Sequence, residues 1–211
     1  RSSNVDLKLF TLFSILLPLI GECKIIETSR IVEAAPYITK DAWFLVDLDN
    51  TLFEGKQALG HADWFYDELQ KRIDQGMSRE EAFTDFYPEW IKTQAICRVK
   101  PLEESFVTLI RSLQAQDITV MGLTHRQPPV AEATIRQVKS LGIDLTLTAP
   151  FADTFCICAK NPTLYLQGVL FVGDFNKKSE IFIPFIKRSE HPPKKIVFID
   201  DKRKNVEDLE S

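Results

Sequence analysis

Two pairs of acidic residues stand where apolar runs of the sequence end. Asp47 and Asp49 follow the first of these runs, and Asp200 and Asp201 follow the last one. A carboxylate can attack phosphorus as a nucleophile, and a second carboxylate can protonate the leaving group and later deprotonate a water. Carboxylates are also the hard oxygen ligands that Mg²⁺ prefers. We therefore predict Asp47 and Asp49 as catalytic residues and all four acids as ligands of a Mg²⁺ cofactor.

A threonine and two adjacent lysines supply the other residue types that bind phosphate. Thr124 ends a middle apolar run, where its hydroxyl and the following backbone amides can donate to phosphate oxygens. Lys177 or Lys178 can neutralise charge on the phosphate and on the nucleophile. The predicted partner is therefore a small phosphorylated substrate.

The apolar runs themselves predict a parallel sheet. Residues 42–46 and 196–199 are continuously apolar and 118–123 are nearly so, which is typical of strands that are buried on both faces. Amphipathic helical patterns lie between them, at 102–113 and at 130–141. This alternation predicts a three-layer, Rossmann-like α/β fold with a parallel central sheet. The carboxyl ends of such strands meet at one edge, where ligands bind.

A helical insertion after the first strand predicts a small cap over the site. We place the cap at about 55–98, with helices at 62–75, from Ser78 onward, and at 89–98. His61 and Trp64 lie where the insertion opens, so both are predicted to be possible substrate contacts.

Two further predictions concern segments after the middle strand. Arg126 can grip a substrate anion with two parallel hydrogen bonds, and a salt bridge to the cap or core is the alternative. Residues 155–159 and 164–172 flank Asn161-Pro162 and predict a hairpin.

Length and charge limit the class of protein. The 211 residues suffice for one α/β domain with a modest insertion. The net charge is −4 and the isoelectric point is near 5.5. Nucleic acid is bound by basic surfaces, so it is excluded as the main partner.

A short apolar segment near the N-terminus predicts export. Residues 9–20 form a run of about twelve residues, shorter than the roughly twenty that span a bilayer. Basic residues precede the run, and the small residues Gly21 and Cys23 follow it. We predict a signal peptide at 1–23, a periplasmic or secreted domain at 24–211 and no stable membrane span after cleavage. The alternative is a buried first helix or strand in a cytoplasmic protein. Both ends of the chain are expected to be truncated.

Taken in order, these segments resemble the four motifs of the haloacid dehalogenase (HAD) superfamily. The resemblance covers 42–205 and implies a magnesium-dependent phosphatase that forms an aspartyl phosphate. Dehalogenases of the superfamily lack the second acid, so Asp49 favours phosphatase chemistry. Relatives often have Lys followed by Gly in the third motif, which favours Lys178 here and leaves Lys177 open. The matching segments are Asp47-x-Asp49-x-Thr51, Val120–Thr124, Asn176–Glu180 and Ile196–Asp201.

Three segments carry a closer resemblance, to an uncharacterised bacterial HAD-like family with an N-terminal export signal. They are Leu59–Phe65, Met121–Arg126 and Phe198–Val206. This resemblance implies the fold and the site but names no substrate. Two alternatives to a phosphatase remain at this point: a phosphotransferase that uses the same residues, and a weakly active or non-catalytic binding protein on the same scaffold.

Overall fold

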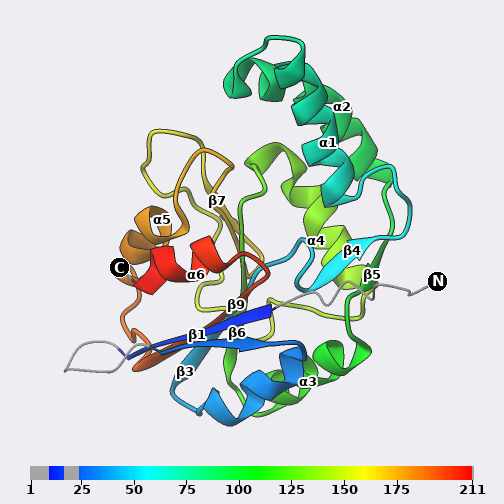
Figure 1. The fold of residues 1–211 in the computed structure, drawn as a ribbon. Coiled ribbons are helices and arrows are strands. Elements are labelled where there is room, and N and C mark those ends of the chain that lie inside the picture. Colours follow the sequence, from blue (N-terminus) through cyan, green and yellow to red (C-terminus); the bar gives the residue numbers. More distant parts are fainter. Residues whose placement is uncertain (1–9, 17–23, 211) are drawn as a thin grey trace.

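A mostly parallel sheet forms the centre of the protein (Figure 1). The computed structural model describes residues 10–16 and 24–210. Within these residues, seven strands form one sheet in the order β2-β1-β9-β3-β6-β8-β7. The pairs β9–β3, β3–β6 and β6–β8 are parallel, whereas β2–β1, β1–β9 and β8–β7 are antiparallel. The strands are β1 (Phe10–Leu16), β2 (Lys24–Thr28), β3 (Ala42–Val46), β6 (Thr119–Thr124), β7 (Leu164–Leu166), β8 (Val169–Phe171) and β9 (Lys195–Asp200).

Helices cover both faces of the sheet, which confirms the mixed α/β class. Along β3, Phe44 and Val46 pack on one face while Leu45 packs on the other. This alternation explains why the run had to be continuously apolar. The first face carries η1 (Ile31–Tyr37), α3 (Glu104–Ala115) and α4 (Ala131–Ser140), and the second face carries α5 (Lys178–Ile186) and α6 (Arg203–Glu210). The short η2 (Pro128–Val130) contributes Val130 to a third cluster.

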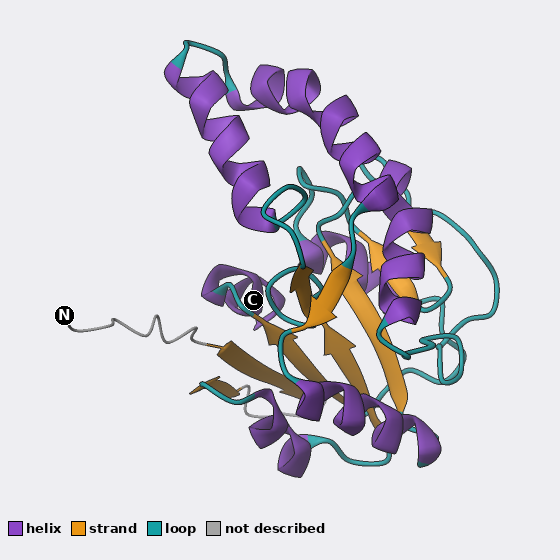
Figure 2. Cartoon of the chain, turned by 90° about the vertical axis from the view of Figure 1, so that its right-hand side faces the viewer, coloured by secondary structure: helices purple, strands orange, loops and turns teal. Residues whose placement is uncertain are grey.

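A pair of helices, α1 (Ala62–Asp74) and α2 (Arg79–Ile96), stands above the carboxyl edge of the sheet (Figure 2). The short pair β4 (Phe53–Gly55) and β5 (Val99–Pro101) joins these helices to the body. The helices bury their own aromatic cluster, which contacts the body through Phe175 among others. We refer to α1 and α2 together as the cap.

The cap contains two helices where the sequence pattern predicted three. Helix α2 runs unbroken through Pro88, so the separate helix predicted at 89–98 was wrong. A proline inside a helix costs about 3 kcal/mol because a hydrogen bond is lost. Phe86 and Trp90, on either side of Pro88, both lie buried against α1. Burial of these rings offsets the proline penalty.

The predicted hairpin around Asn161-Pro162 was also misplaced. The regular hairpin joins β7 to β8, and Phe155 pairs with Tyr165 only through an isolated bridge. The turn of the hairpin is Gln167-Gly168, with φ angles of 46° and 81°. Positive φ at both central residues is typical of the two-residue turns that fit twisted strands. The segment 164–172, which the pattern presented as one strand, therefore folds back on itself.

The N-terminal region was predicted to be a signal peptide at 1–23. Phe10–Leu16 forms β1, between β9 and β2, and the remainder of the segment lies outside the described residues. The signal peptide stays a prediction. None of the helices in the described part of the chain is long and apolar enough to cross a membrane.

Gly168 offers a test of this packing, with Gly76 as its matched control. Both have positive φ, where an alanine is strained by about 1–2 kcal/mol. A Cβ at Gly76 meets nothing within 4 Å, but a Cβ at Gly168 lies 2.5 Å from the carbonyl oxygen of Leu145. We expect Gly168→Ala to lower the free energy of unfolding by about 2 kcal/mol more than Gly76→Ala does. Urea denaturation measures the difference, and equal losses would contradict the packing described.

Candidate active site

The parallel strands bring the predicted site residues to one edge of the sheet. Asp47 follows β3, Thr124 ends β6 and Asp200 ends β9. The Asp47 amide donates to the carbonyl of Ile199 at 2.9 Å, so β3 and β9 stay paired up to this edge. The Thr51 hydroxyl donates to Asp47 Oδ2 at 3.2 Å and accepts from the Asp201 amide at 3.0 Å. The Thr51 hydroxyl thus ties the loop after β3 to the loop after β9.

Lys178 joins two of the acids inside the protein. Its Nζ lies 2.6 Å from Asp47 Oδ1 and 2.6 Å from Asp200 Oδ2, and its side chain is fully buried. Burial favours the neutral amine, but the attraction of Asp200 and Asp47 is stronger and raises the pKa of Lys178. Lys177 is exposed. The structure therefore brings Lys178, and not Lys177, to the acids.

Three carboxylates converge at this point. Asp47, Asp200 and Asp201 each offer an oxygen, and these oxygens all lie within 4.8 Å of one another. Burial, with added repulsion from Asp200, raises the pKa of Asp47 to about 8 even though Lys178 acts in the opposite direction. The same two causes raise the pKa of Asp201 to about 6. One ammonium does not balance three carboxylates, and their oxygens are the donors that suit a Mg²⁺ ion.

Asp49 has a different partner. Arg126 donates to its two carboxylate oxygens from Nε and Nη2, both at 2.7 Å. The remaining Arg126 nitrogen, Nη1, donates to Thr134 at 2.9 Å and to Gln137 at 2.7 Å. The Asp49 carboxylate is thus held by a guanidinium and does not join the three converging acids, although it was predicted as a metal ligand. Of the two interpretations of Arg126, the structure shows the salt bridge.

Thr124 and His125 complete the floor of the site. Thr124 is buried, and its hydroxyl accepts from the Arg126 amide at 3.1 Å. Burial, followed by repulsion from Lys178 and Lys202, holds the pKa of His125 well below its ordinary value. His125 is therefore neutral at pH 7 and can donate or accept a hydrogen bond without adding charge.

A cavity of about 70 Å³ separates this floor from the cap. Five aromatic side chains of the cap form its roof, above Asp47, Asp49 and Thr124. The roof residues are Phe65, Tyr66, Phe83, Tyr87 and Trp90. The cavity therefore combines a charged floor with a largely apolar roof, as small-molecule sites commonly do.

His61 and Trp64 are not among the residues that line the cavity, although both were predicted as possible substrate contacts. His61 is the N-cap of α1, where its ring accepts from the Asp63 amide at 3.2 Å. The Trp64 ring packs inside the cap, with its centroid 5.0 Å from that of Phe86. The phase of α1 instead turns Ala62, Phe65 and Tyr66 toward the cavity.

Several lining residues were missed by the motif analysis. Lys202 donates to the Tyr66 hydroxyl at 2.7 Å and so connects the body to the cap. Attraction from Tyr66 and Asp201 outweighs burial and raises the pKa of Lys202.

Among described residues, Asn50 Oδ1 and the Tyr87 hydroxyl are buried without a hydrogen-bond partner. Both residues line the cavity, and a buried polar atom without a partner indicates a place for a ligand or a water. The sequence offered one indication that these residues lie at the site: Asn50 directly follows Asp49, and Lys202 directly follows Asp201.

The role of Lys178 can be tested beside that of Lys177. Lys178→Met leaves Asp47 and Asp200 buried without their counter-charge, so we expect a loss of about 3 kcal/mol in the free energy of unfolding. Lys177→Met should change it by less than about 0.5 kcal/mol because the side chain is exposed. Urea denaturation measures both losses, and EDTA in the buffer prevents a metal ion from replacing the lost positive charge. Similar losses for both variants would show that the buried ion cluster is not formed.

Comparisons with known proteins identify a family but no activity. The family model described as "Protein of unknown function (DUF2608)" matches residues 24–211. The chain is 33% identical over 189 residues to a "Putative outer membrane protein" of Chlamydia pneumoniae, a match that covers 88% of this chain and 71% of the relative. A protein of the same description from Chlamydia trachomatis is 29% identical over 203 residues, covering 93% of this chain and 76% of the relative.

A third relative comes from another genus. An "Uncharacterized protein" of Rickettsia prowazekii is 26% identical over 196 residues, which cover 88% of this chain and 70% of the relative. No solved structure matches the chain. Because the family model covers nearly all of the described residues, this chain belongs to the DUF2608 family of proteins of unknown function.

Proposed function

We propose that this protein is a Mg²⁺-dependent phosphatase of the HAD type, with Asp47 as its nucleophile. The observation that carries the proposal is the placement of Asp47 on the cavity floor, 2.6 Å from a buried ammonium and beside two further acids. The order of the motifs along the chain supports it independently. A buried carboxylate that only stabilised the fold would not need to line a cavity beneath a cap.

Catalysis would proceed in two displacements. In the first, an Asp47 oxygen attacks phosphorus, the bond to the leaving oxygen breaks, and Asp49 gives that oxygen a proton, which Asp49 would carry in place of one of its hydrogen bonds from Arg126. In the second, a water attacks the aspartyl phosphate, Asp49 takes the proton of the water, and the bond between phosphorus and Asp47 breaks. Thr124 lines the cavity and could donate a hydrogen bond to a phosphoryl oxygen, and Lys178 would offset charge on the nucleophile, to which it donates at 2.6 Å.

Arg126 would position Asp49 for both proton transfers. Its two bonds, at 2.7 Å each, fix the plane of the carboxylate, and Thr134 and Gln137 fix the guanidinium in turn. A lysine offers no such planar fork. The exposure of the Asp49 side chain, 28%, leaves an edge of its carboxyl group open to a substrate.

Asp47, Asp200 and Asp201 would hold the metal ion. Their oxygens form a compact set of hard donors, and their charge exceeds that of Lys178. When bound, Mg²⁺ supplies positive charge that draws the phosphate and the nucleophile together. The donor set fits Mg²⁺ better than zinc, which favours nitrogen and sulfur ligands.

Export to the cell envelope is the second part of the proposal. The family model begins its match at Lys24, the residue after the predicted cleavage point. Relatives from three Chlamydia species are described as putative outer membrane proteins. We propose a periplasmic or secreted location for the domain at 24–211.

Hydrolysis of p-nitrophenyl phosphate tests the chemistry. With Mg²⁺ present we expect turnover that stops in EDTA and falls at least about 10³-fold in Asp47→Asn, since the nucleophile is lost. Asp153→Asn is the matched control, because Asp153 is exposed and does not line the cavity. A folded, Mg²⁺-binding protein without turnover on this or other phosphomonoesters would favour a binding protein on the same scaffold.

Metal binding can be measured apart from activity. Isothermal titration calorimetry should give a dissociation constant for Mg²⁺ that rises at least about tenfold in Asp201→Asn, because one of three charged ligands is removed. Asp174→Asn should leave it unchanged, since Asp174 lines the cavity but is not one of the three acids. Failure of the unmodified protein to bind Mg²⁺ would refute the site.

A further inference from the structure

The inner cavity is the smaller of two connected spaces. Its volume of about 70 Å³ compares with about 530 Å³ for the space beside it. If the proposed function holds, a phosphoryl group seated at Asp47 lies in the inner cavity, and a larger substrate extends into the neighbouring space.

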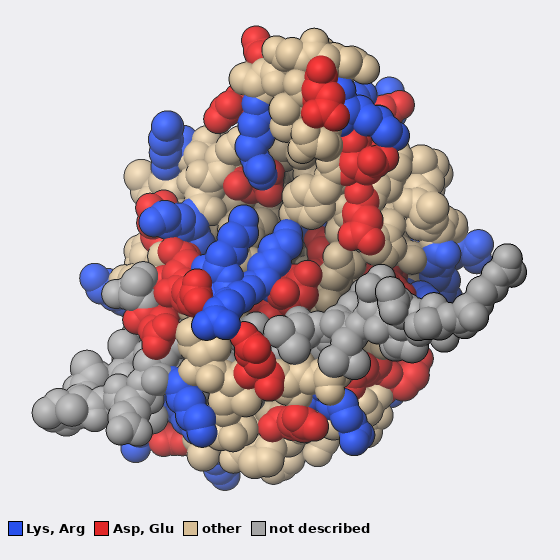
Figure 3. All heavy atoms as spheres, in the orientation of Figure 1, with Lys and Arg blue, Asp and Glu red and all other residues tan. Residues whose placement is uncertain are grey.

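A wider groove of about 530 Å³ opens beside the inner cavity. The two share Tyr66, His125, Asp174, Lys202 and Asn205 in their walls, so they are continuous. We call this space the outer groove. It lies between the cap and the beginnings of α5 and α6, and Figure 3 shows Lys and Arg side chains gathered on the face below the cap.

The outer groove is positively charged in an acidic protein. Five cationic side chains and two carboxylates line it, which gives a formal charge of +3 against −4 for the whole chain. The cations are Arg79, Lys177, Lys178, Lys202 and Lys204, and the carboxylates are Asp174 and Asp208. Cations concentrated along a groove attract anionic ligands.

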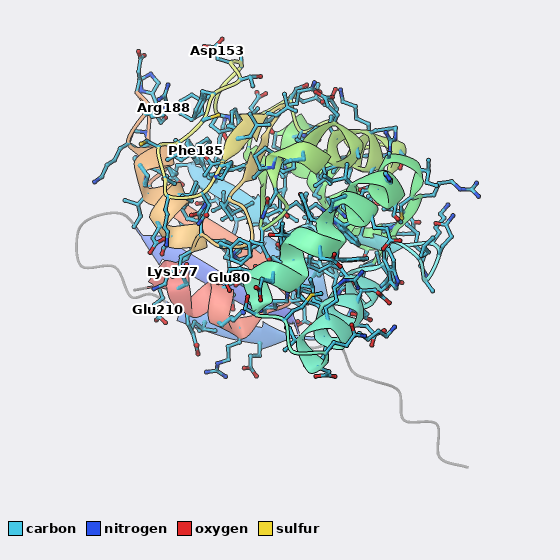
Figure 4. All side chains as sticks on the ribbon, turned by 90° about the horizontal axis from the view of Figure 1, so that it is seen from above. Glu80, Asp153, Lys177, Phe185, Arg188 and Glu210 are labelled. Carbon is cyan, nitrogen blue, oxygen red and sulfur yellow. The ribbon has the colours of Figure 1, made fainter. Side chains whose placement is uncertain are left out.

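Three of these cations form no ion pair with a described residue, and one of the three, Lys202, has a neutral hydrogen-bond partner. Arg79 pairs with Asp174 at 3.4 Å, Lys202 donates to Tyr66, and Lys178 is buried against the acids. Lys177 and Lys204 form no ion pair with a described residue. Figure 4 labels Lys177 at the start of α5, which packs against α6, the helix that carries Lys204.

We infer that the outer groove binds a second phosphate of the substrate, so that the natural substrate is a bisphosphorylated small molecule. The inference rests on the proposed function. A phosphate monoester carries about −1.5 to −2 charge at pH 7, whereas a carboxylate carries one negative charge. The groove's arginine is engaged by Asp174, and three lysines that form no ion pair with a described residue, Lys177, Lys202 and Lys204, remain to match that charge. The number of these cations favours phosphate over carboxylate as the second group.

Calorimetry on the Asp47→Asn protein tests this without turnover, at a Mg²⁺ concentration that a prior titration shows to saturate this variant. The probes are hexane-1,6-diol bisphosphate, hexyl phosphate and 6-(phosphonooxy)hexanoate, which differ only at the distal end. We expect the bisphosphate to bind about tenfold more tightly than hexyl phosphate, as charge-assisted hydrogen bonds to a phosphate allow. The preference should shrink in 0.5 M NaCl because exposed charges are screened.

Matched lysine variants assign the preference to the groove. The double variant Lys177→Gln with Lys204→Gln should bind both probes equally, while its affinity for hexyl phosphate stays unchanged. Lys187→Gln with Lys194→Gln, both exposed and outside the groove, should keep the full preference. Survival of the preference in the first double variant would overturn the inference.

The possible results distinguish failure of the groove inference from failure of the proposed phosphate site. Binding of hexyl phosphate without a preference for the bisphosphate would refute the second phosphate alone. Equal affinity for the carboxylate probe would show that the groove accepts any anion, which also overturns the assignment. No binding of any probe would refute the proposed phosphate site and the groove inference with it.

Discussion

The ammonium of Lys178 holds the edge of the sheet together. Without it, Asp47 and Asp200 would face each other in the interior, where like charges repel strongly. Its position requires α5 to begin next to the ends of β3 and β9, so the three elements are fixed relative to one another. The Thr51 hydroxyl reinforces the same junction by bonding to Asp47 and to the Asp201 amide. The geometry of the candidate site therefore follows from the burial of one cation between two strands.

The same edge carries a second charged pair that is kept separate from the first. Arg126 takes both oxygens of Asp49, and its own contacts lie in α4 rather than in α5. Two carboxylates only two residues apart thus receive different partners from opposite sides of the sheet. Such a division gives neighbouring acids different environments, which is the condition under which two acids can take different roles. The partnerless Tyr87 hydroxyl and Asn50 Oδ1 lie in the cavity between them, where a ligand would satisfy them.

The sequence predicted what depends on local pattern and missed what depends on helix phase and on long-range contacts. Continuous apolar runs located β3, β6 and β9, and the polar residues after them were correctly expected at one edge. The choice between Lys177 and Lys178 needed the register of α5. The pairing of Asp49 with Arg126 joins residues 77 positions apart, and no spacing rule predicts it. The third cap helix failed because burial of aromatic rings outweighed a proline, and the hairpin failed because Gln167-Gly168 supplied the better turn.

The inner cavity and the outer groove, which adjoin at the edge of the sheet, differ in size and in charge. The inner cavity lies between aromatic rings of the cap and the acids that follow β3. The outer groove is several times larger and is lined by residues from the cap, α5 and α6. Lys202 belongs to both walls and bonds to Tyr66 of the cap, and Arg79 of the cap pairs with Asp174 of the body. A ligand in the groove would therefore meet the same cations that join the cap to the body over the cavity.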